Sequence, residues 1–102
     1  MSRQNNKTML FTDYIRRSRE QLQLPQRKLA EALDIDTATY CKIEKGERRI
    51  KREQIRIVAE VLNVNELELR TLWLADQIVE IMENEQEISD NVLDLVKENV
   101  KK

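Results

Sequence analysis

The segment 36–52 carries the side chains whose types and spacing are suited to contact a ligand. Helical spacing places four small, polar or basic residues, and no acid, on one face of a helix. These residues are Thr37, Ala38, Cys41 and Lys42. Gly46 is placed to end that helix, and basic residues surround it. A small polar face next to a basic loop favours a polyanion, such as a phosphate backbone, as the ligand.

Charge is distributed unevenly along the 102 residues, although the net charge is only −1. Residues 1–56 hold 14 Lys and Arg against 8 Asp and Glu, which gives +6. Residues 57–102 hold 4 against 11, which gives −7. This separation indicates two surfaces with different partners. The basic part suits a polyanion, whereas the acidic part would be repelled by one.

The composition argues against several classes of protein. Histidine is absent and Cys41 is the single cysteine, so an internal disulfide is excluded and a zinc site is not expected. The chain has no glycine-rich phosphate loop and no nucleophile–base pair, so we expect neither an enzyme nor a bound cofactor. No signal peptide or membrane span is predicted, and the expected compartment is the cytoplasm.

The scarcity of turn residues, with one glycine and one proline, favours an all-α fold with short connections. Apolar periodicity places Leu10 and Leu22 on the buried stripe of a first helix. The expected helices cover about residues 9–23, 25–33, 37–45, 52–62, 65–82 and 89–100. Asp36 is the predicted N-cap of the third helix, Asp34 a left-handed turn residue, and Ser89 the cap of the last helix.

The sequence LPQRKLAEALDIDTATYCKIEKGERRI, preceded by IRRSRE, resembles the helix-turn-helix domain of phage Cro proteins and repressors, the XRE family. The residues that carry the resemblance are Arg19, Gln26, Leu29, Ala30, Leu33 and the sequence IEKG at 43–46. It implies a five-helix Cro/repressor-like domain at 10–69, with a flexible N-terminal arm at 1–9. Residues 70–102 then form an additional C-terminal helical extension.

The resemblance also implies how the domain contacts double-stranded DNA, with the third helix in the major groove and the second across the backbone. Base contacts are expected from Thr37, Ala38, Cys41 and Lys42. Phosphate contacts are expected from Gln26, Arg27, Lys28, Thr39, Lys45, Arg48, Arg49 and Arg52. The resemblance further implies an ion pair between Arg19 and Glu44, which would join the first helix to the end of the third.

Residues 70–102 contain more apolar side chains than a lone helix can bury against the DNA-binding domain. We therefore expect a homodimer, because two-fold dimers match palindromic sites. The expected interface residues are Trp73, Ile78, Met82, Val92, Leu95 and Val96. The alternative is that this extension folds back over its own domain.

The function expected from these observations is a sequence-specific transcriptional regulator, a homodimeric repressor that binds a palindromic operator and is associated with the nucleoid. Two alternatives stay open. One is an antitoxin or another partner-regulated protein whose C-terminal helices bind a second protein. The other is a restriction–modification control protein.

Overall fold

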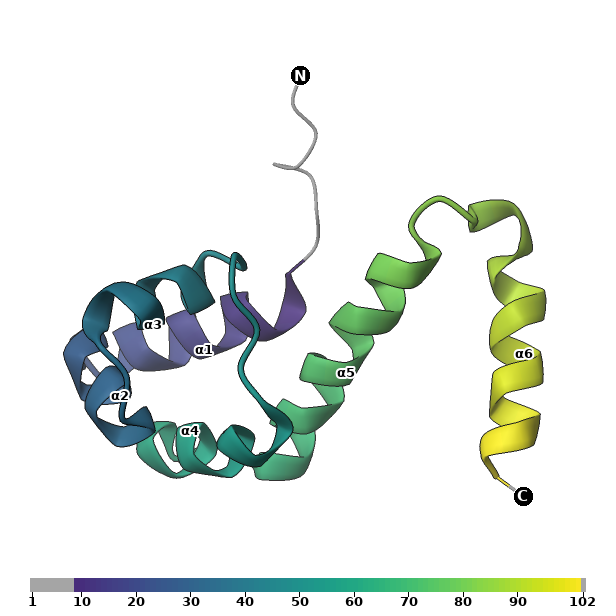
Figure 1. Cartoon of the computed structure of the whole chain (residues 1–102). Coiled ribbons are helices and arrows are strands. Elements are labelled where there is room, and N and C mark those ends of the chain that lie inside the picture. Colours follow the sequence, from purple (N-terminus) through teal and green to yellow (C-terminus); the bar gives the residue numbers. More distant parts are fainter. Residues whose placement is uncertain (1–8, 102) are drawn as a thin grey trace.

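The computed structural model describes residues 9–101, which form six α-helices and no β-strand (Figure 1). The all-α class with a C-terminal helical extension is therefore confirmed. The expected arm lies outside the described residues except for Met9. The elements are α1 (Leu10–Gln21), α2 (Gln26–Leu33), α3 (Thr37–Glu44), η2 (Arg52–Gln54), α4 (Ile55–Leu62), α5 (Glu66–Met82), η3 (Gln86–Ile88) and α6 (Ser89–Val100).

Local residues determine where two of the helices begin and where two others end. The Asp36 carboxylate accepts a hydrogen bond from the Thr39 N–H at 2.8 Å and starts α3, as predicted. Asn65 caps α5 in the same way. Asp34 ends α2 with φ 60°, a left-handed conformation that aspartate tolerates, and Asn63 ends α4 with φ 56°.

Three expectations about the helices are wrong. Leu10 and Leu22 are 38% and 47% exposed; Leu10 is the first residue of α1, and Leu22 is its C-cap residue, just past the last turn. Ser89 does not cap α6, since its own backbone is helical and its hydroxyl donates to the Gln86 carbonyl at 3.1 Å. The stretch 52–54 forms a 3₁₀ turn, so α4 begins at Ile55 and not at Arg52.

The core lies between α1, α2, α3, α4 and the first half of α5, which pack on one another in pairs. Its largest fully buried side chains are Ile15, Leu29, Tyr40, Ile55, Val58 and Leu69. Each such burial contributes about 1.5–3 kcal/mol, so this cluster is the main source of stability of the domain.

Helix α5 also holds α1 and the loop after α3 through polar contacts. The Asp76 carboxylate accepts hydrogen bonds from the backbone N–H groups of Leu10 and Phe11, at 2.9 and 2.8 Å. It therefore caps α1 from a distant part of the chain and places negative charge at a helix N-terminus. The Trp73 indole N–H donates to the Ile50 carbonyl at 3.1 Å. Since α5 runs without interruption from Glu66 to Met82, residues on both sides of position 69 belong to one helix.

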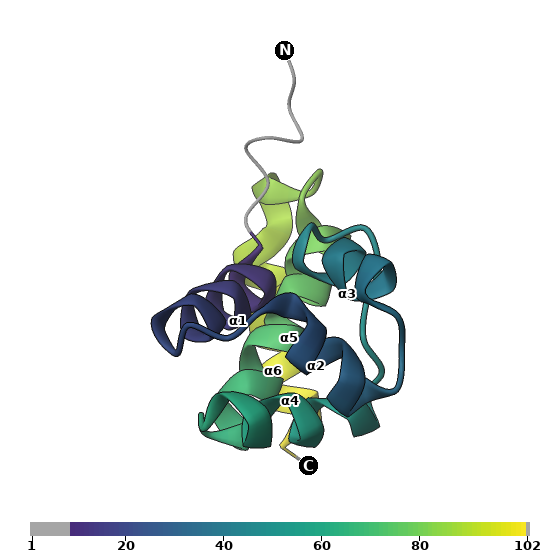
Figure 2. The same ribbon diagram turned by 90° about the vertical axis from the view of Figure 1, so that its left-hand side faces the viewer.

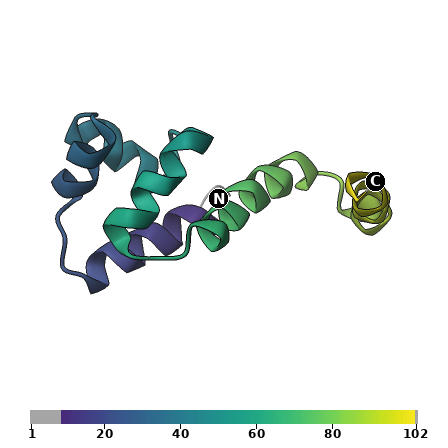
Figure 3. The same cartoon turned by 90° about the horizontal axis from the view of Figure 1, so that it is seen from below.

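Helix α6 lies beyond the end of α5, on the side away from α1–α4 (Figures 1 and 3). None of its residues is buried. The basic α2–α3 region lies at the opposite end of the molecule, facing the viewer in Figure 2 with α6 behind it. No helix among residues 9–101 is both long enough and apolar enough to cross a membrane.

Candidate nucleic-acid interface

Helix α3 has one buried face and one solvent face. Tyr40, Ile43 and Glu44 are buried, and they fix the rotation of the helix on the domain. The expected base-contact residues lie elsewhere on the helix: Thr37, Ala38 and Lys42 are exposed, and Cys41 is half-buried. Small side chains at the start of the helix let its backbone approach a base edge closely, and the helix as a whole suits a major groove.

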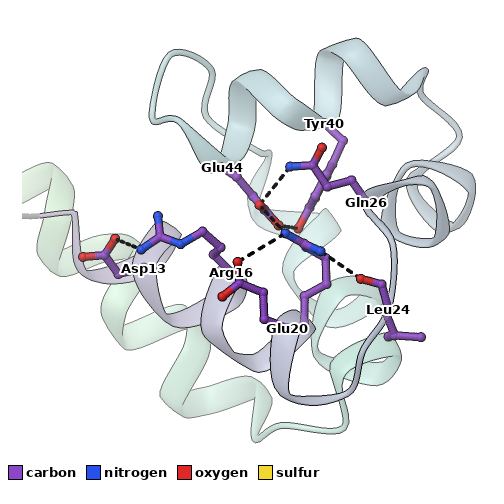
Figure 4. Close-up of polar contacts among 8 residues, drawn as sticks. Asp13, Arg16, Glu20, Leu24, Gln26, Tyr40 and Glu44 are labelled. Atoms are coloured by element: carbon purple, nitrogen blue, oxygen red, sulfur yellow. Dashed lines mark hydrogen bonds and ion pairs between the residues drawn. The ribbon is translucent and has the colours of Figure 1, made fainter.

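A buried polar cluster centred on Glu44 fastens α3 to α1 and α2. The two Glu44 carboxylate oxygens accept hydrogen bonds from Arg19 Nε at 2.7 Å and Arg19 Nη2 at 3.1 Å. Gln26 Nε2 donates to Oε1 at 3.0 Å, and the Tyr40 hydroxyl donates to Oε2 at 2.7 Å. Figure 4 shows Glu44, Gln26 and Tyr40 pointing toward one another. Arg19 also donates to the Leu24 carbonyl at 2.8 Å, which ties in the chain that enters α2.

The environment of this cluster keeps Glu44 ionised. Burial on its own raises the pKa of the Glu44 carboxyl, but the hydrogen bonds from Arg19, Tyr40 and Gln26 outweigh it and lower the pKa. The hydrogen bond to Glu44 raises the pKa of Arg19. Burial first, and the Glu44 carboxylate second, raise the pKa of Tyr40, so its hydroxyl remains a donor. The cluster is therefore an ion pair with two neutral donors that complete it.

The start of α2 offers a second group of anion contacts. Pro25 is the N-cap and provides no side-chain cap hydrogen bond, and the N-terminus of a helix favours an anion such as a phosphate. Gln26, expected to contact phosphate, uses one amide proton on Glu44 and retains a second. Arg27 and Lys28 are exposed, and Arg27 lies 3.4 Å from the Glu31 carboxylate.

One surface depression brings together residues from α1, α2 and α3. Its volume is about 450 Å³, and its lining includes Arg16, Gln26, Cys41 and Lys45. Arg16 was not among the residues expected to bind DNA. Its guanidinium lies 3.2 Å from the Asp13 carboxylate, a half-exposed pair that a phosphate can displace at low cost (Figure 4). The depression thus holds one expected base contact, Cys41, and two expected phosphate contacts, Gln26 and Lys45, and its lining also includes the acids Asp13, Glu20 and Glu44.

The loop after α3 forms the basic edge of this surface. Gly46 has φ 80°, which permits the sharp exit from α3, and a Cβ added there would collide with the Met9 methyl group. Lys45, Arg48 and Arg49 are exposed around it. Two of the expected phosphate contacts lie at other places: Arg52 is exposed at the start of η2, and Thr39 is half-buried in the first turn of α3.

One loop arginine is held by the acidic half of the chain. Arg49 Nη2 lies 2.8 Å from Glu80 Oε1 on α5, and both side chains are about half exposed. Neither this pair nor the Asp76 cap has a local sequence signal, because the partners are about 30 and 65 residues apart. The Tyr40–Glu44 hydrogen bond, in contrast, has the i, i+4 spacing of neighbours on a helix, and that spacing is a signal that sequence reasoning can use.

The residues expected at a dimer interface lie in two different environments. Trp73 is half-buried, and its ring packs against the core of its own domain. Ile78 and Met82 lie in the second half of α5, where Ile78 is exposed and Met82 is half-buried. The other three, Val92, Leu95 and Val96, lie on α6, outside the core.

The sequence was also compared with known proteins. Residues 15–69, just over half of the chain, match a protein-family model whose description is helix-turn-helix (HTH_3). This match begins in α1 and ends in the first turn of α5, so it covers the Glu44 cluster, α2, α3 and the basic loop. Neither the search of curated proteins nor that of solved structures gave a significant match.

Proposed function

This chain belongs to the helix-turn-helix family HTH_3, whose members are XRE-type, Cro/C1-type DNA-binding transcriptional regulators and not enzymes, and from that premise we propose that it is a homodimeric repressor of a palindromic operator. The family match supports DNA binding and transcriptional regulation of the XRE type. The dimer, the palindrome and the sign of regulation are the proposed part. Such a protein would be associated with the nucleoid, where its operators lie.

The observation that carries the proposal is the acid-free outer face of α3, held at a fixed rotation by the Glu44 cluster beneath it. Thr37 offers a hydroxyl, Ala38 a methyl group for a thymine methyl, and Lys42 a cation for guanine O6 and N7. The basic loop and the start of α2 flank this face with phosphate contacts. Base contacts by three short or flexible side chains leave a large share of specificity to DNA shape.

A dimer follows from the size of an operator. One α3 helix covers one half-site, and a two-fold pair presents two such helices to half-sites one helical turn apart. The acidic second half of the chain keeps the extension away from phosphates, so it is free to make the protein–protein contact. A dimer bound across a promoter would repress by excluding the polymerase.

Selection of bound DNA from a random pool tests the proposal. We expect a palindrome whose half-sites are separated by about 10 base pairs. Lys42→Ala should change the preferred base within each half-site, whereas Arg48→Ala should weaken binding to all sequences alike and flatten the salt dependence by about 0.9 in log–log slope per phosphate contact. A pool in which no sequence is enriched after several rounds of selection would contradict the proposal.

The acidic and partly apolar extension also favours a second candidate, in which it binds a different protein. An antitoxin would use it in this way, and a restriction–modification control protein is a narrower variant, marked by a neighbouring methyltransferase or endonuclease gene. A stable complex between the purified chain and the product of a neighbouring gene, together with no enriched sequence in the selection, would favour this candidate over the repressor.

A further inference from the structure

Helix α5 has an apolar seam on the face opposite the core. Trp73, Asp76 and Glu80 lie on the inner face, where they contact the domain. The outer face carries a series of residues at alternating spacings of four and three, the heptad spacing of helix–helix seams. The outer seam of α5 consists of Leu67, Thr71, Leu74, Ile78 and Ile81. Its leucines and isoleucines are between 38% and 74% exposed.

Helix α6 has an apolar stripe of its own. Val92 and Val96 lie at its centre, with Leu93, Leu95 and Val100 beside them. The acids of this helix, Asp90, Asp94 and Glu98, follow one another at i, i+4 and i+8 and lie on the opposite face. The apolar stripe of α6 therefore carries no charge. The stripe can pack against another helix while the carboxylates on the opposite face stay in solvent, although the extension as a whole is strongly acidic.

Neither surface has a partner within the described part of the chain. All of α6 lies outside the core, and it has only 12 residues, a length at which an isolated helix is marginal in water. The two surfaces also match in length, since α6 is about 18 Å long and the Leu67–Ile81 seam about 21 Å at 1.5 Å per residue. Each chain thus presents one apolar helix without a partner and one apolar seam of the same length.

We infer that two copies of this chain exchange their last helices, so that the α6 stripe of each copy packs on the outer α5 seam of the other. This inference rests on the homodimer of the proposed function and specifies how it is built. Pairing of α5 with α5 alone would leave both α6 stripes in water, and pairing of α6 with α6 alone would leave both seams in water. The reciprocal exchange covers all four surfaces and closes on itself as a two-fold dimer.

Disulfide trapping in the full-length chain tests the exchange. Cys41→Ser first removes the native thiol. Two chains are then made, one with Leu74→Cys and one with Val96→Cys. These positions lie at the middle of the seam and of α6, so they meet whichever way the helices run. The chains carry tags of different size and are mixed in equal amounts under mild oxidation. We expect the mixed disulfide to exceed both homodisulfides, because only Cα atoms within about 7 Å can be bridged.

Asp94→Cys, on the acidic face of α6, is the matched control and should give no excess of mixed disulfide with Leu74→Cys. A chain that carries both Leu74→Cys and Val96→Cys tests whether α6 folds back on its own α5. An intrachain disulfide in monomers would overturn the inference, as would equal trapping by the control. Sedimentation equilibrium adds a second readout. Val96→Asp should raise the dimer dissociation constant at least about tenfold, whereas Asn91→Asp, on the polar face, should leave it unchanged.

Failure of the exchange and failure of the regulator proposal give different results. A palindrome enriched by a chain that gives no mixed disulfide would overturn the exchange alone. A mixed disulfide in a protein that enriches no DNA sequence would support the exchange and contradict the repressor proposal.

Discussion

Replacement of Glu44 by alanine tests whether a buried ion pair holds α3 on the domain. The side chains of Glu44 and Arg19 are 4% and 12% exposed, and the carboxylate accepts four hydrogen bonds from three residues. In Glu44→Ala the guanidinium retains the Leu24 carbonyl but loses its counter-charge. The Tyr40 hydroxyl also loses its partner in a buried position.

The expected loss of unfolding free energy is large for a single substitution. Removal of one partner of a buried ion pair costs about 3–5 kcal/mol. The lower end applies here, because Arg19 keeps one hydrogen bond and some contact with water. At about 4–8 °C per kcal/mol for a domain of this size, a loss of about 3 kcal/mol lowers Tm by about 12–24 °C. DNA affinity should fall as well at temperatures where the variant is folded, because the rotation of α3 is no longer fixed.

Thermal unfolding followed by circular dichroism at 222 nm measures the effect. Glu47→Ala is the matched control, because Glu47 is exposed and three residues away; its Tm should stay within about 2 °C of wild type. The reasoning is refuted if Glu44→Ala also melts within that range, since the cluster would then contribute no more than a surface pair.

The same cluster predicts how stability depends on pH. Burial raises the pKa of folded Glu44, but the hydrogen bonds from Arg19, Tyr40 and Gln26 together outweigh it and hold the pKa below its ordinary value of 4.5. The unfolded chain therefore binds a proton before the folded one as pH falls, and the stabilisation is complete above about pH 4.5. The difference in unfolding free energy between wild type and Glu44→Ala should be constant from pH 7 to 5 and shrink as pH falls through the folded pKa. A difference that grows on acidification would contradict this assignment.

Three further substitutions give smaller expected effects. Gly46→Ala should cost about 1–3 kcal/mol in urea unfolding, because alanine is strained at φ 80°, whereas the methyl end of the Met9 side chain can move aside at low cost; an unchanged midpoint would contradict this. Glu80→Gln releases Arg49 from its ion pair, so binding to non-specific DNA should tighten and the salt slope should steepen by about 0.9 in fluorescence anisotropy titrations. An unchanged slope would show that the arginine contacts no phosphate. Trp73→Phe removes the indole donor to the loop and should lower stability by about 1 kcal/mol by circular dichroism.

Sequence patterns predicted the ends of helices correctly where a single residue determines them. Asp36, Asp34 and Asn65 act through their own side chains or their own φ, so short stretches of sequence contain the whole cause. Ser89 shows the limit of this reasoning. A serine before an apolar run is a good cap, but the 3₁₀ turn ahead of it already brings the chain into helical conformation, and the cap position moves to Ile88.

The site was less accessible to sequence reasoning, for a physical reason. The Arg19–Glu44 pair was expected only because the sequence resembles a family, since no local spacing joins α1 to the end of α3. The contribution of Gln26 to that cluster depends on the packing of α2 against α3, which sets the 3.0 Å distance. Contacts between distant segments, such as Asp76 with the start of α1, require the complete fold before they can be identified.

The two faces of helix α5 make different contacts, one with its own domain and one with the inferred second copy. Its inner face caps α1 through Asp76, supports the loop carbonyl through Trp73 and holds Arg49 through Glu80. Its outer face is the seam on which a second copy is inferred to dock. A rotation of α5 would move both faces together, because a helix rotates as a rigid body. If docking rotates α5, the basic loop moves with it through Trp73 and Glu80, and the salt slope of DNA binding should differ between the dimer and a Val96→Asp monomer measured on a single half-site. Equal slopes would mean that the two faces of α5 act independently.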